Sequence, residues 1–281
     1  MRRVFPVFCI AAALLVALRA EAQTPTCDAL SGDKKALAMS LLNSEHPYDC
    51  CDDTIANCLK KKPACALAVR LAENICRRVQ NNQDRATVSR GLAKRARSMI
   101  SVKKAAIDLS NAPMLGDPAA PVTLVMYACA RCPFCGKMTT KLTKTVTEGA
   151  LKGKVKLYFR VFPIRSHEYS KETGLGFMAA QKLGKFWEFV TYSYEHFDSF
   201  CIAKQGDWAE AVGMDPAEFQ KIVADPITRQ LLVESKKEGI VNKVDATPTF
   251  FIDGVKYVGD NTHDELVDVA EEVFERKKGH P

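Results

Sequence analysis

The placement of the cysteines constrains this chain more than any other feature of its sequence. Among 281 residues there are 11 cysteines, and all but Cys9 fall into two groups. The first group is Cys27, Cys50, Cys51, Cys58, Cys65 and Cys76, and the second is Cys129, Cys132, Cys135 and Cys201. Two populations suggest two parts with different tasks, the first of them stapled by disulfides.

The N-terminus is typical of an export signal. Arg2 and Arg3 precede the apolar run Val4 to Leu18, and Ala20-Glu21-Ala22 places small residues where a signal peptidase cuts. The run is shorter than the roughly 20 residues that cross a bilayer. We therefore expect residues 1–22 to be removed near Ala22 and the rest to reach an oxidising compartment.

Composition excludes some classes of protein. With 47% hydrophobic and 26% charged residues the chain is expected to fold, and its length predicts about two domains. The net charge of +7 is mild and spread out, so nucleic acid is not an expected partner.

The first part, residues 23–110, is predicted to be all helical, since it contains no run rich in β-branched residues. Asp53 and Thr54 are placed to cap a helix, and Pro63 begins the next one. Adjacent Cys50 and Cys51 do not easily bond each other, so each is expected to reach a different helix. Spacing does not choose among the pairings of the six cysteines.

A heptad-like stripe follows over about residues 84–108, with one break. Its members are Val88, Leu92, Arg95, Met99, Val102, Ala106 and Leu109. Two interpretations are open: a helix that packs against its own domain, or a dimer or trimer stalk over residues 84–109 that makes the protein a homo-oligomer.

Helix breakers at residues 111–121 predict a linker, and residues 122–281 predict an α/β domain. Val122 to Tyr127, a helix from Pro133, and Val155 to Phe162 form a β-α-β unit with parallel strands. A helical stretch is expected over about residues 166–239. Asp253-Gly254 then predicts a hairpin between Thr249 to Asp253 and Val255 to Val258, before a last helix over about residues 262–278.

The chemistry is expected where the first strand passes into the first helix of that unit, at Cys132-Pro133-Phe134-Cys135. Unpaired N–H groups and the positive end of a helix stabilise a thiolate, so Cys132 is the predicted nucleophile, with its sulfur open to water. Arg131 adds positive charge nearby. Cys135, one turn into the helix, is predicted to be the shielded resolving thiol that attacks a mixed disulfide on Cys132.

Three cysteines at every third position, Cys129, Cys132 and Cys135, keep a second interpretation open, which is soft-metal binding such as copper(I). Cys129 and Cys201 are interpreted either as a structural bridge or as separate thiols. His167 is expected to be a helix cap or a packing residue. The sequence shows no phosphate loop or hydrolytic triad, so we expect neither a cofactor nor a resident metal site.

Several sequence blocks together resemble the exported DsbA-like thiol-disulfide oxidoreductases, over about Gly116 to Lys277. They are Gly116-Asp117 through Pro121-Val122-Thr123-Leu124-Val125, Cys132-Pro133-Phe134-Cys135, Phe162-Pro163 with His167, Gly184-Lys185-Phe186-Trp187, and Ala246-Thr247-Pro248-Thr249-Phe250-Phe251. The resemblance implies a thioredoxin fold with a helical insertion, preceded here by the disulfide-stapled helical domain. It also implies a cis bond before Pro248, opposite Cys132, with Thr247 and Pro248 binding the client peptide.

The same resemblance implies a periplasmic or secreted protein that acts on exported proteins with cysteines and exchanges electrons with a membrane redox partner. Two positions depart from the family. Met126 stands where many relatives carry a buried carboxylate, which leaves proton transfer at Cys135 without a partner. Phe134 has no side-chain donor, so an extreme oxidising potential is not expected.

The predicted function is therefore the formation or isomerisation of disulfides in exported proteins. A copper(I)-handling protein, a thioredoxin-like reductant and an adaptor built on the first domain are the alternatives.

Overall fold

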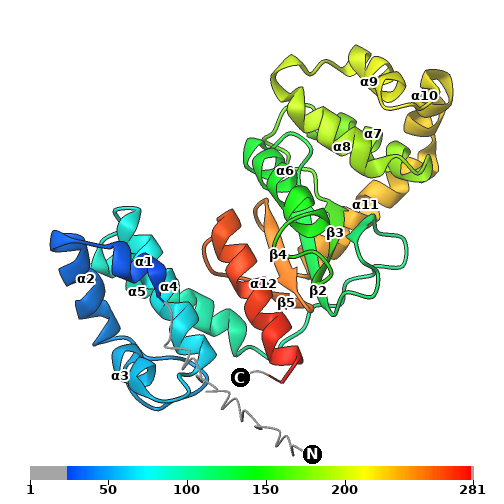
Figure 1. The fold of residues 1–281 in the computed structure, drawn as a ribbon. Coiled ribbons are helices and arrows are strands. Elements are labelled where there is room, and N and C mark those ends of the chain that lie inside the picture. Colours follow the sequence, from blue (N-terminus) through cyan, green and yellow to red (C-terminus); the bar gives the residue numbers. More distant parts are fainter. Residues whose placement is uncertain (1–23, 280–281) are drawn as a thin grey trace, which may run out of the picture.

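The computed structural model describes residues 24–279, so the predicted signal sequence lies outside the described residues. Helices α1–α5 form the N-terminal part beside α12, and α7–α10 form a lobe at the other end of the sheet (Figure 1). Between Thr24 and Gly279, none of the helices is both long and apolar enough to cross a membrane.

The N-terminal part is all helical, as predicted. It comprises α1 (Pro25–Ala29), α2 (Gly32–Leu42), α3 (Ile55–Lys60), α4 (Ala66–Gln80) and α5 (Arg85–Met99). The Thr54 hydroxyl caps α3 by accepting from the Asn57 N–H. The helices pack around buried apolar side chains that include Leu41, Ile55 and Leu71.

Three disulfides staple these helices: Cys27–Cys76, Cys50–Cys65 and Cys51–Cys58. Cys50 reaches Cys65 at the start of α4, whereas Cys51 reaches Cys58 within α3. The prediction that the adjacent cysteines bond to different helices is confirmed.

The predicted extent of the helix over residues 84–108 is wrong, because α5 ends at Met99. Residues 101–109 instead run as an extended strap, whose Ala105 N–H donates to the Gly254 carbonyl at 2.8 Å. Ala105, Ile107 and Leu109 pack on the sheet because their alternation matches an extended chain better than a helix. Val88 and Leu92 of the stripe are buried among the chain's own N-terminal helices.

The sheet has the strand order β1-β3-β2-β4-β5. The strands are β1 (Met114–Gly116), β2 (Val122–Ala128), β3 (Val155–Val161), β4 (Thr249–Ile252) and β5 (Val255–Lys256). The parallel pairing of β2 with β3 and the β4–β5 hairpin are confirmed. Strand β1 lies inside the stretch predicted as a linker and pairs with β3, which is a correction.

Two layers of side chains cover this sheet. On one face, Leu124 and Met126 pack with α6 (Pro133–Thr147) and α12 (His263–Lys277). On the other face, Val125, Tyr127 and Phe251 pack with the strap. The helical insertion runs from Ser170 to Val241, close to the predicted range. Its helices are α7 (Ser170–Lys182), α8 (Phe186–Glu195), α9 (Gln205–Ala211), α10 (Pro216–Ala224) and α11 (Pro226–Val241), with short 3-10 turns at Phe197–Ser199 and Ile202–Lys204.

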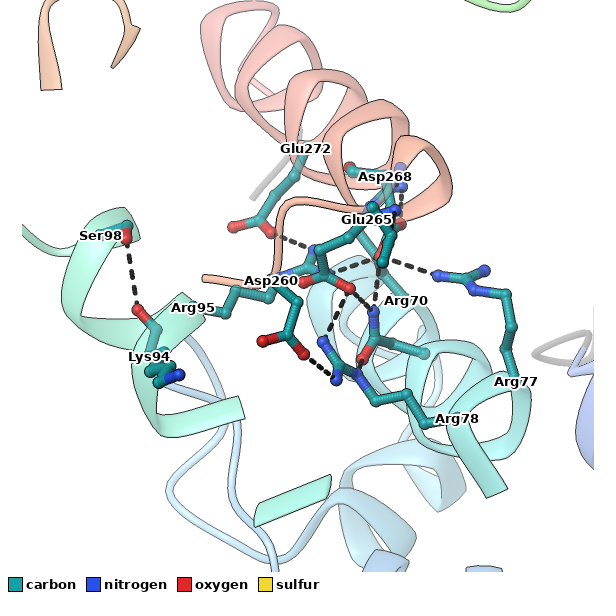
Figure 2. Close-up of polar contacts among 12 residues, drawn as sticks. Arg70, Arg77, Arg78, Lys94, Arg95, Ser98, Asp260, Glu265, Asp268 and Glu272 are labelled. Atoms are coloured by element: carbon teal, nitrogen blue, oxygen red, sulfur yellow. Dashed lines mark hydrogen bonds and ion pairs between the residues drawn. The ribbon is translucent and has the colours of Figure 1, made fainter. Parts of the chain in front are cut away.

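Buried ion pairs join the N-terminal helices to α12 (Figure 2). Arg70 and Arg78 come from α4 and Arg95 from α5, and their main partners on α12 are Glu265, Asp268 and Glu272. These six side chains fix the N-terminal part on the face of α12 that points away from the sheet.

Candidate active site

The two cysteines of the predicted redox motif lie at the start of α6. Cys132 is the N-cap residue and Pro133 the first helical residue, directly after the turn that follows β2. The Cys132 N–H donates to the Cys129 carbonyl at 3.1 Å and closes this turn. Strand, turn and helix therefore place Cys132 at a positive helix end, as the sequence predicts.

The expectation that the Cys132 sulfur is open to water is wrong, because Cys132 is only 2% exposed and Cys135 is 0% exposed. The loop before β4 lies against the motif, and the Cys132 sulfur lies 3.6 Å from the Thr247 carbonyl oxygen. Phe134 is 70% exposed, so its ring lies on the surface while Cys132 lies just below. Access to the sulfur is therefore through the rim between this surface and the Thr247 loop.

The pKa of the Cys132 thiol is lowered to about 5. The hydrogen bond from Cys135 lowers it most, and the N–H groups of Cys135 and Phe134 and the side chain of Thr247 add to this effect against the cost of burial. The lowered pKa favours the thiolate form of Cys132.

Cys135 has the opposite character. Burial raises the pKa of the Cys135 thiol far above its usual range, and the neighbouring Cys132 raises it further. The pKa values of these two thiols, three residues apart, are thus shifted in the opposite directions that a nucleophile and a resolving thiol require.

The peptide bond between Thr247 and Pro248 is cis, and the Thr247 carbonyl faces the sulfur of Cys132. The structure therefore brings together four of the residues named from the sequence, Cys132, Cys135, Thr247 and Pro248. They come from the start of α6 and from the loop before β4.

The Arg131 side chain packs against the helical insertion. Its guanidinium donates to the Phe197 carbonyl at 2.7 Å and lies 4.1 Å from the centre of the Phe197 ring and 4.7 Å from that of Phe200. The largest causes of the lowered pKa of Cys132 are its contacts with Cys135, Phe134 and Thr247 and not the charge of Arg131. The side chain instead ties the motif to the helical lobe by cation–π contact.

Cys129 and Cys201 form no bridge, since both are free and Cys129 is buried whereas Cys201 is exposed. The Cys129 sulfur lies 3.2 Å from Nδ1 of His167. Sequence reasoning placed His167 as a cap or packing residue and missed this contact, because the two residues lie on different segments.

The family model for thioredoxin, Thioredoxin_4, matches residues 109–272, which is more than half of the chain. The chain belongs to this thioredoxin family. Its fold is that of DsbA-like thiol-disulfide oxidoreductases, and the resemblance seen in the sequence is confirmed.

Two solved structures have a fold similar to that of this chain. Oxidised BdbD from Bacillus subtilis superposes with a TM-score of 0.55 at 19% identity, covering 61% of this chain and 97% of BdbD. The thiol-disulfide exchange protein alpha-DsbA2 from Wolbachia pipientis gives 0.52 at 20% identity, covering 67% of this chain and 94% of its own. The DsbA-like fold supports thiol–disulfide exchange.

A curated relative of this thioredoxin-family chain is the Na(+)/H(+) antiporter NhaA 1 of Mycobacterium sp. (strain KMS). It is 31% identical over 148 residues, which are 51% of this chain and 24% of that protein. The chain thus spans about a quarter of the length of this relative. The antiport activity in this name is a property of the relative.

The thioredoxin-family site has no carboxylate at position 126. Met126 is fully buried there, and the Thr139 hydroxyl donates to its sulfur at 3.8 Å. Sequence reasoning missed Tyr194, a buried residue of α8 whose hydroxyl donates to the Cys129 carbonyl at 3.1 Å. Its ring also lies against Gly136, where a Cβ would come within 2.9 Å of it. Tyr194 thus supports the turn and the first helical turn that carry both sulfurs.

Across residues 24–279, the structure holds no group of three or more His, Cys, Asp or Glu side chains placed to bind a metal ion. Cys129, Cys132 and Cys135 are close in sequence but do not form such a group. The copper(I) interpretation therefore receives no support from the geometry.

Proposed function

We propose that this protein is an exported thiol–disulfide oxidoreductase that forms disulfides in other exported proteins, with Cys132 as its nucleophile and Cys135 as its resolving thiol. One observation carries the proposal. At the start of α6, the pKa of Cys132 is lowered to about 5 while that of Cys135 is raised, and the Thr247 carbonyl faces Cys132.

In the oxidising direction the site begins as a Cys132–Cys135 disulfide. A client thiolate attacks the Cys132 sulfur, forming a mixed disulfide, and Cys135 leaves and takes up a proton. A second client thiolate then attacks the client sulfur of the mixed disulfide, and Cys132 leaves as a thiolate. Two electrons pass from the client to the protein, and a membrane redox partner removes them.

The low pKa of Cys132 favours this direction, because a thiol with a lower pKa is the better leaving group. Thr247 and Pro248 are proposed to bind the client as an extended segment beside the sulfurs. Arg131, Pro133 and Phe134 complete the proposed site by holding the motif and forming its exposed rim. Export is supported by the composition of residues 1–22 and by the three disulfides of the N-terminal part.

Trapping tests the roles of the two cysteines. Cys135→Ala removes the resolving thiol, so clients are expected to accumulate as mixed disulfides on Cys132 that disappear on reduction. Cys132→Ser in the same background is the matched control and should trap nothing. Trapping through another cysteine, or none at all in an exporting cell, would exclude the proposed roles.

Equilibration of the pair with glutathione tests the direction of transfer. A potential near −120 mV is typical of a strong oxidase and one near −270 mV of a reductant, and we expect a value on the oxidising side of about −200 mV. A value near −270 mV would establish the thioredoxin-like reductant instead.

Isomerisation by a homo-oligomer is the second candidate, raised by the stripe over residues 84–109. Val88, Leu92 and Arg95 of that stripe already pack within one chain, which favours a monomeric oxidase. Light scattering decides between the two, because a stalk requires a mass of two or three chains.

A further inference from the structure

The N-terminal helices are connected to the proposed client-binding loop through the segment that precedes α12, residues 257–262. The side-chain amide of Asn261 donates to the Pro248 carbonyl at 2.9 Å. The adjoining Thr247 carbonyl oxygen lies 3.6 Å from the Cys132 sulfur. Asn261 therefore holds the loop that faces the nucleophile but makes no hydrogen bond to either sulfur.

The segment that carries Asn261 has a fixed shape. Tyr257 is buried, and its hydroxyl donates to Glu265 at 3.0 Å. A Cβ at Gly259 would overlap the Tyr257 hydroxyl, so the chain passes directly over this side chain. Thr262 then caps α12 by accepting from the Glu265 N–H at 3.3 Å. These contacts hold both ends of the segment.

Arg78, in the N-terminal part, binds the middle of the segment. Arg78 of α4 binds Asp260 at 2.6 Å through Nη1 and Glu265 at 3.0 Å through Nη2 (Figure 2). Its Nε donates to Asn74 at 2.7 Å, so the guanidinium is held on three sides. Gly91 of α5 leaves room for it, since a Cβ there would lie 2.6 Å from Nη1.

We propose that Asn261 is a positioning residue for client binding, and that Arg78 sets the place of Asn261 through Asp260. The inference rests on the proposed function. A client that pairs with the backbone at Thr247 binds best to a loop that is already ordered, because less entropy is lost on binding. The Asn261 bond supplies that order, and it touches only a backbone carbonyl. Its loss should weaken client binding and leave the chemistry at Cys132 unchanged.

Asn261→Ala in the full-length protein tests the first link. Asn261 is exposed, so the substitution should leave the fold intact. With a two-cysteine peptide as the client, KM is expected to rise about threefold to tenfold, as for one hydrogen bond. The turnover number and the pH midpoint of Cys132 alkylation should not move.

Asn242→Ala is the matched control. The amide of Asn242 also donates to a backbone carbonyl, that of Ala106 at 2.8 Å, on another part of the surface. This variant should keep the KM of the unchanged protein. If Asn261→Ala also keeps that KM, or shifts the alkylation midpoint, the inference is overturned.

Asp260→Ala tests the link to the N-terminal part, because Arg78 keeps its contacts with Glu265 and Asn74. KM is expected to rise, and adding Asn261→Ala should raise it little further, since both changes break one chain of contacts. If the two substitutions raise KM independently, so that their factors multiply in the double variant, Arg78 does not set the place of Asn261. The loss of turnover in Cys132→Ser is measured separately and tests the proposed function. An unchanged KM in the Asn261 or Asp260 variant would therefore not count against that function.

Discussion

Arg95 of α5 and Asp268 of α12 are 173 residues apart in sequence, yet Nη1 of the arginine lies 2.5 Å from the aspartate. Arg95 is 0% exposed and also binds Glu272 at 2.7 Å. Despite the cost of burial, Arg95 and Arg70 hold the pKa of Asp268 below its usual range. The N-terminal helices are therefore anchored to the thioredoxin-like part by charges that are largely buried.

We expect Arg95→Met to destabilise the whole protein by about 3–5 kcal/mol, because it leaves Asp268 and Glu272 buried with less compensating charge. Denaturant unfolding of the oxidised protein measures the change. Lys185→Met is the control, since the Lys185–Glu188 pair has side chains 41% and 51% exposed and should be worth less than about 1 kcal/mol. Equal effects would mean that the buried ion pairs of Arg95 contribute no more to stability than an exposed ion pair.

The fold of the second part was predictable because its local patterns agree with its topology. An apolar strand, a helix that opens with proline and an Asp253-Gly254 turn each specify one element. The strap over residues 101–109 was not predictable in the same way. Ala106 and Leu109 continue a helical stripe, and only the apolar sheet face formed by Val125 and Phe251 favours the extended form.

The site was predictable for a different reason, since Cys132 and Cys135 need only a local spacing and a helix end. Thr247 and Pro248 came from the family resemblance. The burial of Cys132 and the contact of Cys129 with His167 depend on loops brought together by the fold. The ion pairs on α12 were equally unpredictable, because no residue near Arg95 in sequence indicates its partners.

The lowered pKa of Cys132 predicts the pH dependence of its reaction with iodoacetamide. The thiolate is present above about pH 5 and is lost as the pH falls through this value, so the alkylation rate should reach half its maximum near pH 5. In Cys135→Ala the largest cause of the shift is gone, and the midpoint should move toward the usual value of about 8.5. A midpoint near 8.5 in the unchanged, reduced protein would contradict the assignment of Cys132 as the nucleophile.

Within residues 24–279, the four free cysteines should differ in their reactivity. Cys201 is exposed, whereas Cys129 is fully buried and burial raises the pKa of its thiol. We expect brief treatment of the reduced, folded protein at pH 8 to label Cys201, which is exposed, and Cys132, which is nearly buried but has a lowered pKa, and to spare Cys129 and Cys135. Peptide mapping identifies the labelled residues, and the same treatment after unfolding should label all four. Rapid labelling of Cys129 in the folded protein would show that its contact with His167 opens to solvent.

The three disulfides should contribute unequally to stability. Cys27–Cys76 closes a loop with a sequence separation of 49 residues, whereas Cys51–Cys58 closes one of 7. Constraint of the unfolded chain grows with loop length, so replacing the first pair with serine or alanine should cost about 4 kcal/mol and replacing the second about 2 kcal/mol. Equilibrium unfolding of the two double variants, with Cys132 and Cys135 kept in one redox state, measures the difference. The reverse order would mean that native packing around Cys51 and Cys58, and not chain entropy, governs the contribution of these bonds.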